Sequence, residues 1–306
     1  MSRPALLLLI WLLLAPVAAV AEGPRVAASI LPVHSLSAAL MADVGEPRLV
    51  IPANASPHAH SLRPSEARAL ADAELVVWIG PEMESLLVRP LRTLGVRAEI
   101  LTLRDADGVV TRPLRANPDW QAHDHAHGSA AAIDGHLWLD PHNARHMARA
   151  IAAALARLDP PNAALYARNL ATLERRLEAL DAELNAQLAP LRDAPYYVFH
   201  DAYQYLEARY GLDALGAISL SPERAPGARR LRALRAALGA QQARCVFSEP
   251  QFDAAIVGTL IEDTGIRHGV LDPLGADIAP GPDAYFVLMR RLGAELAECL
   301  EAGETH

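Results

Sequence analysis

Residues 161–189, PNAALYARNLATLERRLEALDAELNAQLA, form one long helical pattern near the middle of the chain. Six leucines recur in it at steps of three and four, from Leu170 to Leu188, which is the spacing of one face of an α-helix. Pro160 precedes the pattern, Pro161 is its first residue and Pro190 follows it, as expected at helix boundaries. At about 1.5 Å per residue the helix is roughly 40 Å long, enough to join two lobes stiffly. A coiled-coil dimer is the alternative interpretation of the same leucines.

Short apolar runs of the kind found in buried parallel strands lie on both sides of this helix. The first series comprises residues 25–31, 48–51, 75–79 and 99–103, with helical patterns at 34–44, 64–73 and 82–91. The second series comprises residues 196–199, 214–219, 245–248 and 269–271, again with helical patterns between and after them.

Alternating strands and helices predict an α/β fold with parallel sheets. We therefore expect two pseudo-symmetric α/β lobes joined by a long rigid helix. The first lobe is expected over residues 22–159, the linking helix over 160–190 and the second lobe over 191–306.

The first 21 residues have the pattern of a secretory signal peptide. Arg3 precedes an apolar run from Ala5 to Val20, and Ala19-Val20-Ala21 has the small-x-small pattern of a cleavage site. A membrane anchor is the alternative, but Pro16 interrupts the run and its length is marginal for spanning a bilayer. We expect cleavage near Ala21 and a soluble periplasmic protein.

Charge and composition exclude several function classes. The formal net charge is −8, which argues against nucleic acid or an anionic membrane as the partner. The sequence contains no lysine, so Schiff-base chemistry and a P-loop lysine are excluded. Two cysteines occur, Cys245 and Cys299. In an oxidising compartment such a pair is expected to form a disulfide, whereas a metal-binding pair would need further thiols or a CxxC spacing.

Three histidines, His58, His136 and His200, lie at loops that follow or adjoin predicted strands. Asp272 ends the run at residues 269–271 in the same way. Ligands of parallel α/β sheets bind beyond the carboxyl ends of the strands, and three imidazoles with one open position can hold zinc. The residues therefore predict a metal site between the lobes, although each histidine taken alone is more often a structural residue.

The sequence gives weaker support for other histidines as ligands of the same site. His60 lies two residues after His58 and is a possible ligand. His142 and His146 have the i, i+4 spacing of zinc peptidases, but the glutamate of HExxH is missing; we expect them on a helix that Asp140 and Pro141 begin. His123, His125 and His127 alternate in a polar segment that is either an auxiliary metal-capturing loop or a loop without function.

Several motifs together resemble the zinc-specific substrate-binding proteins of bacterial ABC importers, in the cluster A-I metal-binding family. The resemblance covers essentially the whole mature chain. It rests on the segments ASILPVHSL (28–36), SPHAHSLRP (56–64), HLWLDP (136–141), FHDAY (199–203), SPE (221–223), FSEPQF (247–252) and LDPL (271–274).

The resemblance implies a non-catalytic carrier that binds Zn²⁺ in an interlobe cleft and delivers it to an inner-membrane ABC permease with its ATPase. It implies His58, His136 and His200 as ligands, Asp272 as a ligand or a near neighbour, and Cys245–Cys299 as the disulfide of some zinc-binding members. Three imidazoles and at most one carboxylate favour zinc over manganese, although nickel, copper or cobalt can use the same donors. We expect a monomer, and we retain a secreted zinc hydrolase and an adhesin-like surface protein as less favoured alternatives.

Overall fold

Two parallel sheets, one in each lobe, form the framework of the molecule and confirm the expected α/β architecture. The computed structural model describes residues 23–94, 97–115, 133–219, 226–240 and 242–301. The first sheet has the strand order β2-β1-β3-β4, with β1 at Val26–Ala28, β2 at Arg48–Leu49, β3 at Leu75–Trp78 and β4 at Glu99–Thr102. The second has the order β6-β5-β7-β8, with β5 at Tyr196–Val198, β6 at Gly216–Ala217, β7 at Cys245–Ser248 and β8 at Arg267–Val270.

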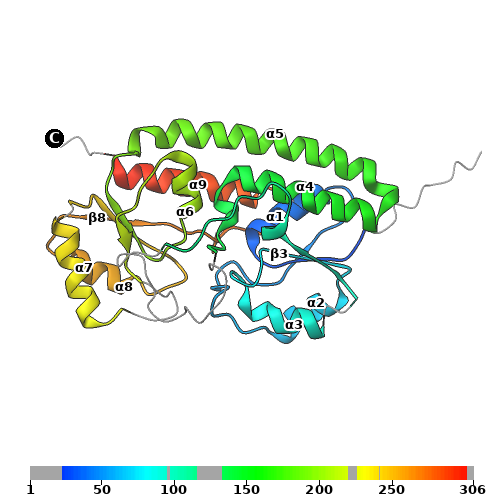
Figure 1. The fold of residues 1–306 in the computed structure, drawn as a ribbon, viewed down its shortest axis with the longest axis horizontal. Helices are drawn as coiled ribbons and strands as arrows, with labels where there is room; N and C mark the ends of the chain where they lie inside the picture. Colours follow the sequence, from blue (N-terminus) through cyan, green and yellow to red (C-terminus); the bar gives the residue numbers. More distant parts are fainter. Residues whose placement is uncertain (1–22, 95–96, 116–132, 220–225, 241, 302–306) are drawn as a thin grey trace, which may run out of the picture.

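The central strands are apolar because helices cover both faces of each sheet. All residues of β1, β3, β5 and β7 are buried, as expected for strands without a solvent-facing side. In the first lobe α1 (Leu31–Leu40) and α4 (Pro141–Leu158) lie on one side of the sheet, and α2 (Pro64–Asp72) and α3 (Val88–Thr93) lie on the other (Figure 1). In the second lobe α6 (Gln204–Tyr210) and α9 (Ala284–Leu300) lie opposite α7 (Ala228–Ala240) and α8 (Ala255–Ile261).

The long helix expected from the leucine pattern is α5, Ala163–Leu188. It runs along both lobes and covers α4 and α9 (Figure 1). Leu173, Leu177, Leu180, Leu184 and Leu188 are at most 2% exposed. The leucine stripe therefore packs against helices of the same chain, as a linking helix requires.

Several element boundaries differ from the sequence prediction. The first strand ends at Ala28, and α1 already begins at Leu31, because Pro32 is favourable at the first positions of a helix. The helix expected over residues 82–91 is divided into a 3-10 turn, Ser85–Leu87, and the short α3. The last strand, β8, begins two residues before the apolar run at 269–271 and ends one residue before it.

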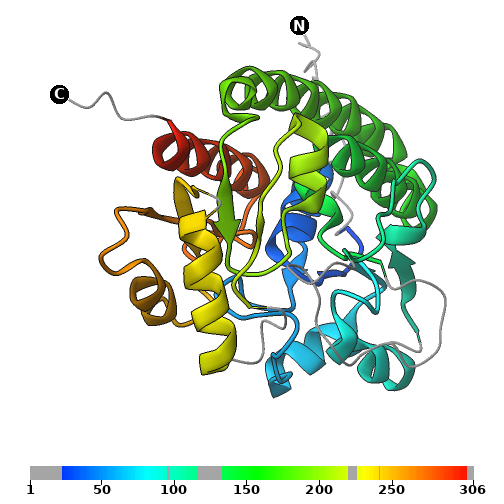
Figure 2. The same ribbon diagram turned by 60° about the vertical axis from the view of Figure 1, so that its left-hand side comes forward.

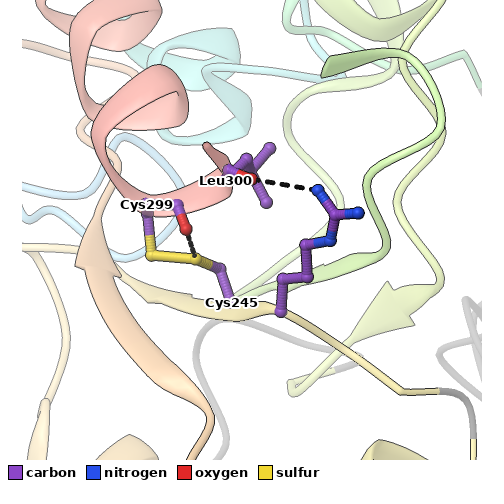
Figure 3. Close-up of a disulfide and its surroundings, with 4 residues drawn as sticks. Cys245, Cys299 and Leu300 are labelled. Carbon is purple, nitrogen blue, oxygen red and sulfur yellow. Dashed lines mark hydrogen bonds between the residues drawn. A yellow bond between two sulfur atoms is a disulfide. The ribbon is translucent and has the colours of Figure 1, made fainter. Parts of the chain in front are cut away.

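The expected disulfide is present between Cys245 and Cys299. It joins the first residue of β7 to the last turn of α9 (Figure 3), with 6.0 Å between the two Cα atoms. It therefore fixes the C-terminal helix to the centre of the second sheet. Among the described residues, no helix combines the length and the apolar character needed to cross a membrane.

Buried hydrogen bonds connect the lobes near the end of the 3-10 helix Leu137–Leu139. The indole Nε1 of Trp138 donates to the carbonyl of Pro273 at 2.9 Å, and the hydroxyl of Tyr285 donates to the carbonyl of Trp138 at 2.8 Å. Trp138 and Tyr285 are both fully buried. Because these buried bonds would be broken without replacement if the lobes separated here, they oppose such a separation.

Candidate metal centre

His136 is held by a carboxylate two residues before it. Its backbone N–H and its ring Nδ1 contact Oδ1 of Asp134 at 3.0 and 2.7 Å. When Asp134 is ionised its carboxylate only accepts hydrogen bonds, so that Nδ1 of His136 carries the proton and Nε2 has a free lone pair. Carboxylate partners orient metal-binding histidines in this way. His136 is 5% exposed, and the ring therefore has little freedom to turn.

His200 has an equivalent partner in the second lobe. It follows β5, and its Nδ1 lies 2.7 Å from Oε1 of Glu249, just beyond the end of the neighbouring strand β7. His200 and Glu249 are 6% and 2% exposed. The pairing again places the proton on Nδ1 and leaves Nε2 as a donor atom for a metal.

His58 comes from the loop that follows β2 in the first lobe. Its backbone N–H donates to the hydroxyl of Ser56 at 3.3 Å, a local turn of a kind that serine commonly stabilises. The residue is half-buried. It is thus the most accessible of the three histidines.

The fold brings these three imidazoles together from both lobes. One donor atom from each lies within 4.8 Å of the others, and the Nε2 atoms of His136 and His200 are 3.4 Å apart. The ring of His58 is 5.7 Å from that of His136 and 6.1 Å from that of His200, between centroids. The cavity that they line has a volume of about 10 Å³, which suits an ion or a water molecule.

Burial and neighbouring charges shift the pKa values of these histidines in different directions. Burial, reinforced by the other imidazoles, lowers the pKa of His58 and of His136 well below the ordinary value. For His200, burial acts downward, but the charge and hydrogen bond of Glu249 outweigh it and raise the pKa. Burial also raises the pKa of Asp134 to about 7. Two of the three rings are therefore neutral, as metal binding requires, before any ion arrives.

Asp272 does not join the three histidines. Its Oδ1 accepts hydrogen bonds from Gln251 at 2.8 Å and from the backbone N–H of Leu274 and Gly275 at 3.0 and 2.9 Å, and Oδ2 accepts from Ala276. These contacts shape the turn after β8. Asp272 is therefore outside the group of donor atoms that lie within 4.8 Å of one another, and its role as a ligand stays a prediction.

His60 is also directed away from the cluster. Its Nε2 lies 2.8 Å from Oε2 of Glu66, and both side chains are 8% exposed. Glu66 in addition accepts from the backbone N–H of Arg63 at 2.7 Å, at the start of α2. His123, His125 and His127 lie outside the described residues.

His142 and His146 occupy the first turns of α4, as the sequence predicts. Asp140 is the N-cap, accepting from the backbone N–H of His142 at 2.8 Å, and Pro141 is the first helical residue. The two rings are 4.8 Å apart, and Nδ1 of His146 contacts the carbonyl of Asp107 at 3.0 Å. Neither residue belongs to the group formed by His58, His136 and His200.

Asp134 and Met83 are site residues that the sequence analysis did not identify. Asp134 occurs as Asp-Gly-His with His136, a local pattern that could have indicated a carboxylate partner. Met83 lines the cavity and is 1% exposed, and a Cβ at Gly135 would lie 2.9 Å from its Cβ. A glycine at 135 therefore permits the close approach of this segment to Met83. The sequence around residue 83 has no pattern that predicts this contact.

Comparison with known proteins agrees with the geometry. The family described as zinc-uptake complex component A, periplasmic, matches residues 26–299. The high-affinity zinc uptake system protein ZnuA of Brucella abortus is 41% identical, and the alignment covers 91% of this chain and 92% of that protein. The protein of the same name from Paracoccus denitrificans is 37% identical, with 99% and 100% covered.

Solved structures show the same fold. A crystal structure of ZnuA is 26% identical to the chain, with a TM-score of 0.79 over 92% of this chain and 100% of that one. A ZnuA deletion mutant with zinc bound is 25% identical, with a TM-score of 0.74 over 92% and 99%. The fold of this chain is thus shared with solved structures that carry the name ZnuA.

Proposed function

Because the chain belongs to the family of periplasmic zinc-uptake components, we propose that it captures Zn²⁺ between its lobes and delivers it to an ABC importer. The observation that carries the proposal is the convergence of three buried or half-buried imidazoles from two lobes. Curated relatives that align with this chain over nearly their whole length carry the name of a high-affinity zinc uptake protein. A permease and its ATPase in the inner membrane are the partners that this function implies.

The proposed ligands are His58, His136 and His200, each offering one nitrogen. Zinc prefers tetrahedral coordination by nitrogen and sulfur donors, and a fourth position can hold water. We assign this position to water rather than to His60 or Asp272, since both of those side chains have hydrogen-bond partners elsewhere. Imidazole also accepts nickel, copper and cobalt, whereas manganese favours oxygen donors; zinc is therefore favoured over manganese.

The role is that of a carrier without catalysis. A zinc hydrolase needs room for substrate beside the metal-bound water, and the cavity of about 10 Å³ is too small for a substrate. His136 and His200 are also nearly inaccessible to solvent. A buried ion held between lobes fits transport, since the protein must retain zinc until it meets its permease.

The proposed organisation follows from this role. Residues 1–21, outside the described part of the chain, act as a cleaved signal peptide that directs the protein to the periplasm. The first lobe extends over 22–159, the linking helix over 160–190 and the second lobe over 191–306, in a monomer. The Cys245–Cys299 disulfide fits an oxidising compartment.

Metal analysis combined with competitive titration tests the proposal. The mature wild-type protein should bind one zinc ion per chain with an affinity well below micromolar, and His200→Ala should weaken this binding severely. His60→Ala is the matched control, because His60 lies outside the cluster, and it should bind zinc like the wild type. Failure of the wild type to bind zinc below micromolar levels, or zinc-dependent turnover of ester, peptide or β-lactam substrates, would contradict a carrier function.

A further inference from the structure

Helix α6 holds the two chain segments that border residues 116–132. The side-chain Nε2 of Gln204 donates to the carbonyl of Pro113 at 3.1 Å. The hydroxyl of Tyr205 accepts from the backbone N–H of Arg112 at 2.8 Å and donates to the carbonyl of Asp134 at 2.8 Å. Hydrogen bonds thus join this helix of the second lobe to two segments of the first lobe, residues 112–115 and 133–136.

Arg115 adds a largely buried ion pair to this junction. Its guanidinium donates a hydrogen bond to Oε2 of Glu207 in α6 and lies 3.4 Å from Oδ1 of Asp201. The side chains of Arg115, Asp201 and Glu207 are 17%, 16% and 5% exposed. Glu207 also accepts from the hydroxyl of Tyr196 at 3.2 Å. The cation is therefore held between carboxylates that are themselves anchored in the second lobe.

The same junction leads directly to two of the proposed zinc ligands. Asp201 follows His200 in the chain, and α6 begins four residues after His200. On the other side, Asp134 both contacts His136 through its carboxylate and contacts Tyr205 through its carbonyl. A displacement of the first-lobe segment from α6 would therefore change the position of His136 relative to His200.

We propose that Arg115 is a positioning residue that sets the spacing of His136 and His200 across the lobes, and thereby the affinity and residence time of the bound zinc. This inference rests on the proposed zinc-binding function. Loss of the guanidinium leaves Asp201 and Glu207 without this cationic partner, and buried carboxylates that lose such a partner are strongly unfavourable. The segment is then expected to move away from α6, and metal sites tolerate displacements of only about 0.5 Å.

A planar guanidinium is suited to this task. It presents donors to two carboxylates at once, whereas an ammonium group is a single compact charge on a flexible stem. Arg115→Lys should therefore preserve the charge but contact only one of Asp201 and Glu207 well. A graded response, with lysine between arginine and alanine, is the signature of positioning by this ion pair.

The test compares zinc affinity and zinc dissociation rate in the mature protein for wild type, Arg115→Ala and Arg115→Lys. Competitive titration and chelator-triggered release supply the two readouts. Partners that orient metal ligands typically contribute about 10- to 100-fold to metal affinity, so Arg115→Ala should bind zinc that much more weakly and release it faster. Arg104→Ala is the matched control: Arg104 pairs with Glu82 and Asp105 within the first lobe, and zinc binding should stay at the wild-type level.

Thermal melting of the zinc-free proteins separates positioning from simple stabilisation. If Arg115→Ala lowers the melting temperature but binds zinc like the wild type, the inference is overturned and Arg115 is only structural. If Arg115→Ala does not fold, Arg115→Gln is judged by the same criteria. If the wild type itself lacks tight zinc binding, the proposed function fails and the inference with it; wild-type affinity together with an unchanged Arg115→Ala variant rejects the inference alone.

Discussion

Replacing Glu249 by glutamine should weaken zinc binding by acting on His200. Oε1 of Glu249 lies 2.7 Å from Nδ1 of His200, and Glu249 is 2% exposed. The carboxylate holds the proton on Nδ1 and so keeps Nε2 free for the metal. A glutamine can present either its oxygen or its NH₂ group to Nδ1. The first orientation gives a weaker hydrogen bond, and the second favours the tautomer whose Nε2 carries the proton and cannot bind zinc.

The expected magnitude follows from this contact. Hydrogen-bond partners of metal-bound histidines are worth about 10- to 100-fold in metal affinity, which corresponds to about 1.4–2.7 kcal/mol. The free energy of unfolding of the zinc-free protein should change less, because glutamine also removes a carboxylate that is costly to bury. We therefore expect the loss mainly in the bound state.

Glu66→Gln is a matched control for the assay. Glu66 contacts Nε2 of His60 at 2.8 Å, so the substitution changes the same kind of carboxylate–imidazole pair outside the cluster. Competitive titration against a chelator of known affinity, at neutral pH, measures both variants and the wild type. Glu249→Gln should lose affinity, and Glu66→Gln should keep it.

Two results would refute the reasoning. Wild-type affinity in Glu249→Gln would show that the Glu249–His200 contact does not prepare the ring for zinc. Equal losses in both variants would show that His60 and its partner belong to the site, contrary to the geometry.

Three further predictions concern pH, the disulfide and the turn after β8. Glu249 raises the pKa of His200 above its ordinary value of about 6.5, so protons begin to compete with zinc at a pH higher than that. As the pH is lowered through this pKa, zinc affinity should fall by about tenfold per pH unit. Titrations between about pH 8 and pH 5.5 measure the change, and a pH-independent affinity would contradict the prediction. Replacing Cys245 and Cys299 by serine should lower the free energy of unfolding by about 4 kcal/mol, given the separation of 54 residues, with unchanged zinc affinity; urea unfolding and titration give the two values. Asp272→Asn should lower stability by about 1–3 kcal/mol through weakened backbone hydrogen bonds, and a drop in zinc affinity of about tenfold or more would instead identify Asp272 as a ligand.

The architecture could be predicted from sequence because its signals are local. The leucine spacing and flanking prolines of α5 and the short buried strands depend on neighbouring residues alone. Boundaries were less well predicted where tertiary contacts decide them. The early start of α1 and the division of residues 82–91 into two short helices are examples.

Only part of the candidate site could be predicted from the sequence. Parallel strands place their carboxyl ends at one edge of a sheet, which is why His200 and the loop of His58 could be named in advance. Hydrogen-bond partners of the histidines that lie far away in the sequence could not be predicted. Glu249 lies 49 residues from His200, and no local pattern indicates that these two side chains will meet.

By itself, the sequence determined two α/β lobes, a linking helix, one possible cysteine pair and a set of histidines suited to zinc. Only the tertiary structure separated His58, His136 and His200 from His60 and Asp272. The physical reason is competition for hydrogen bonds: Glu66 engages His60, and backbone N–H groups of the turn after β8 engage Asp272. Donor type and spacing along the chain are sequence properties, whereas the direction of a side chain depends on the partners that the fold places beside it.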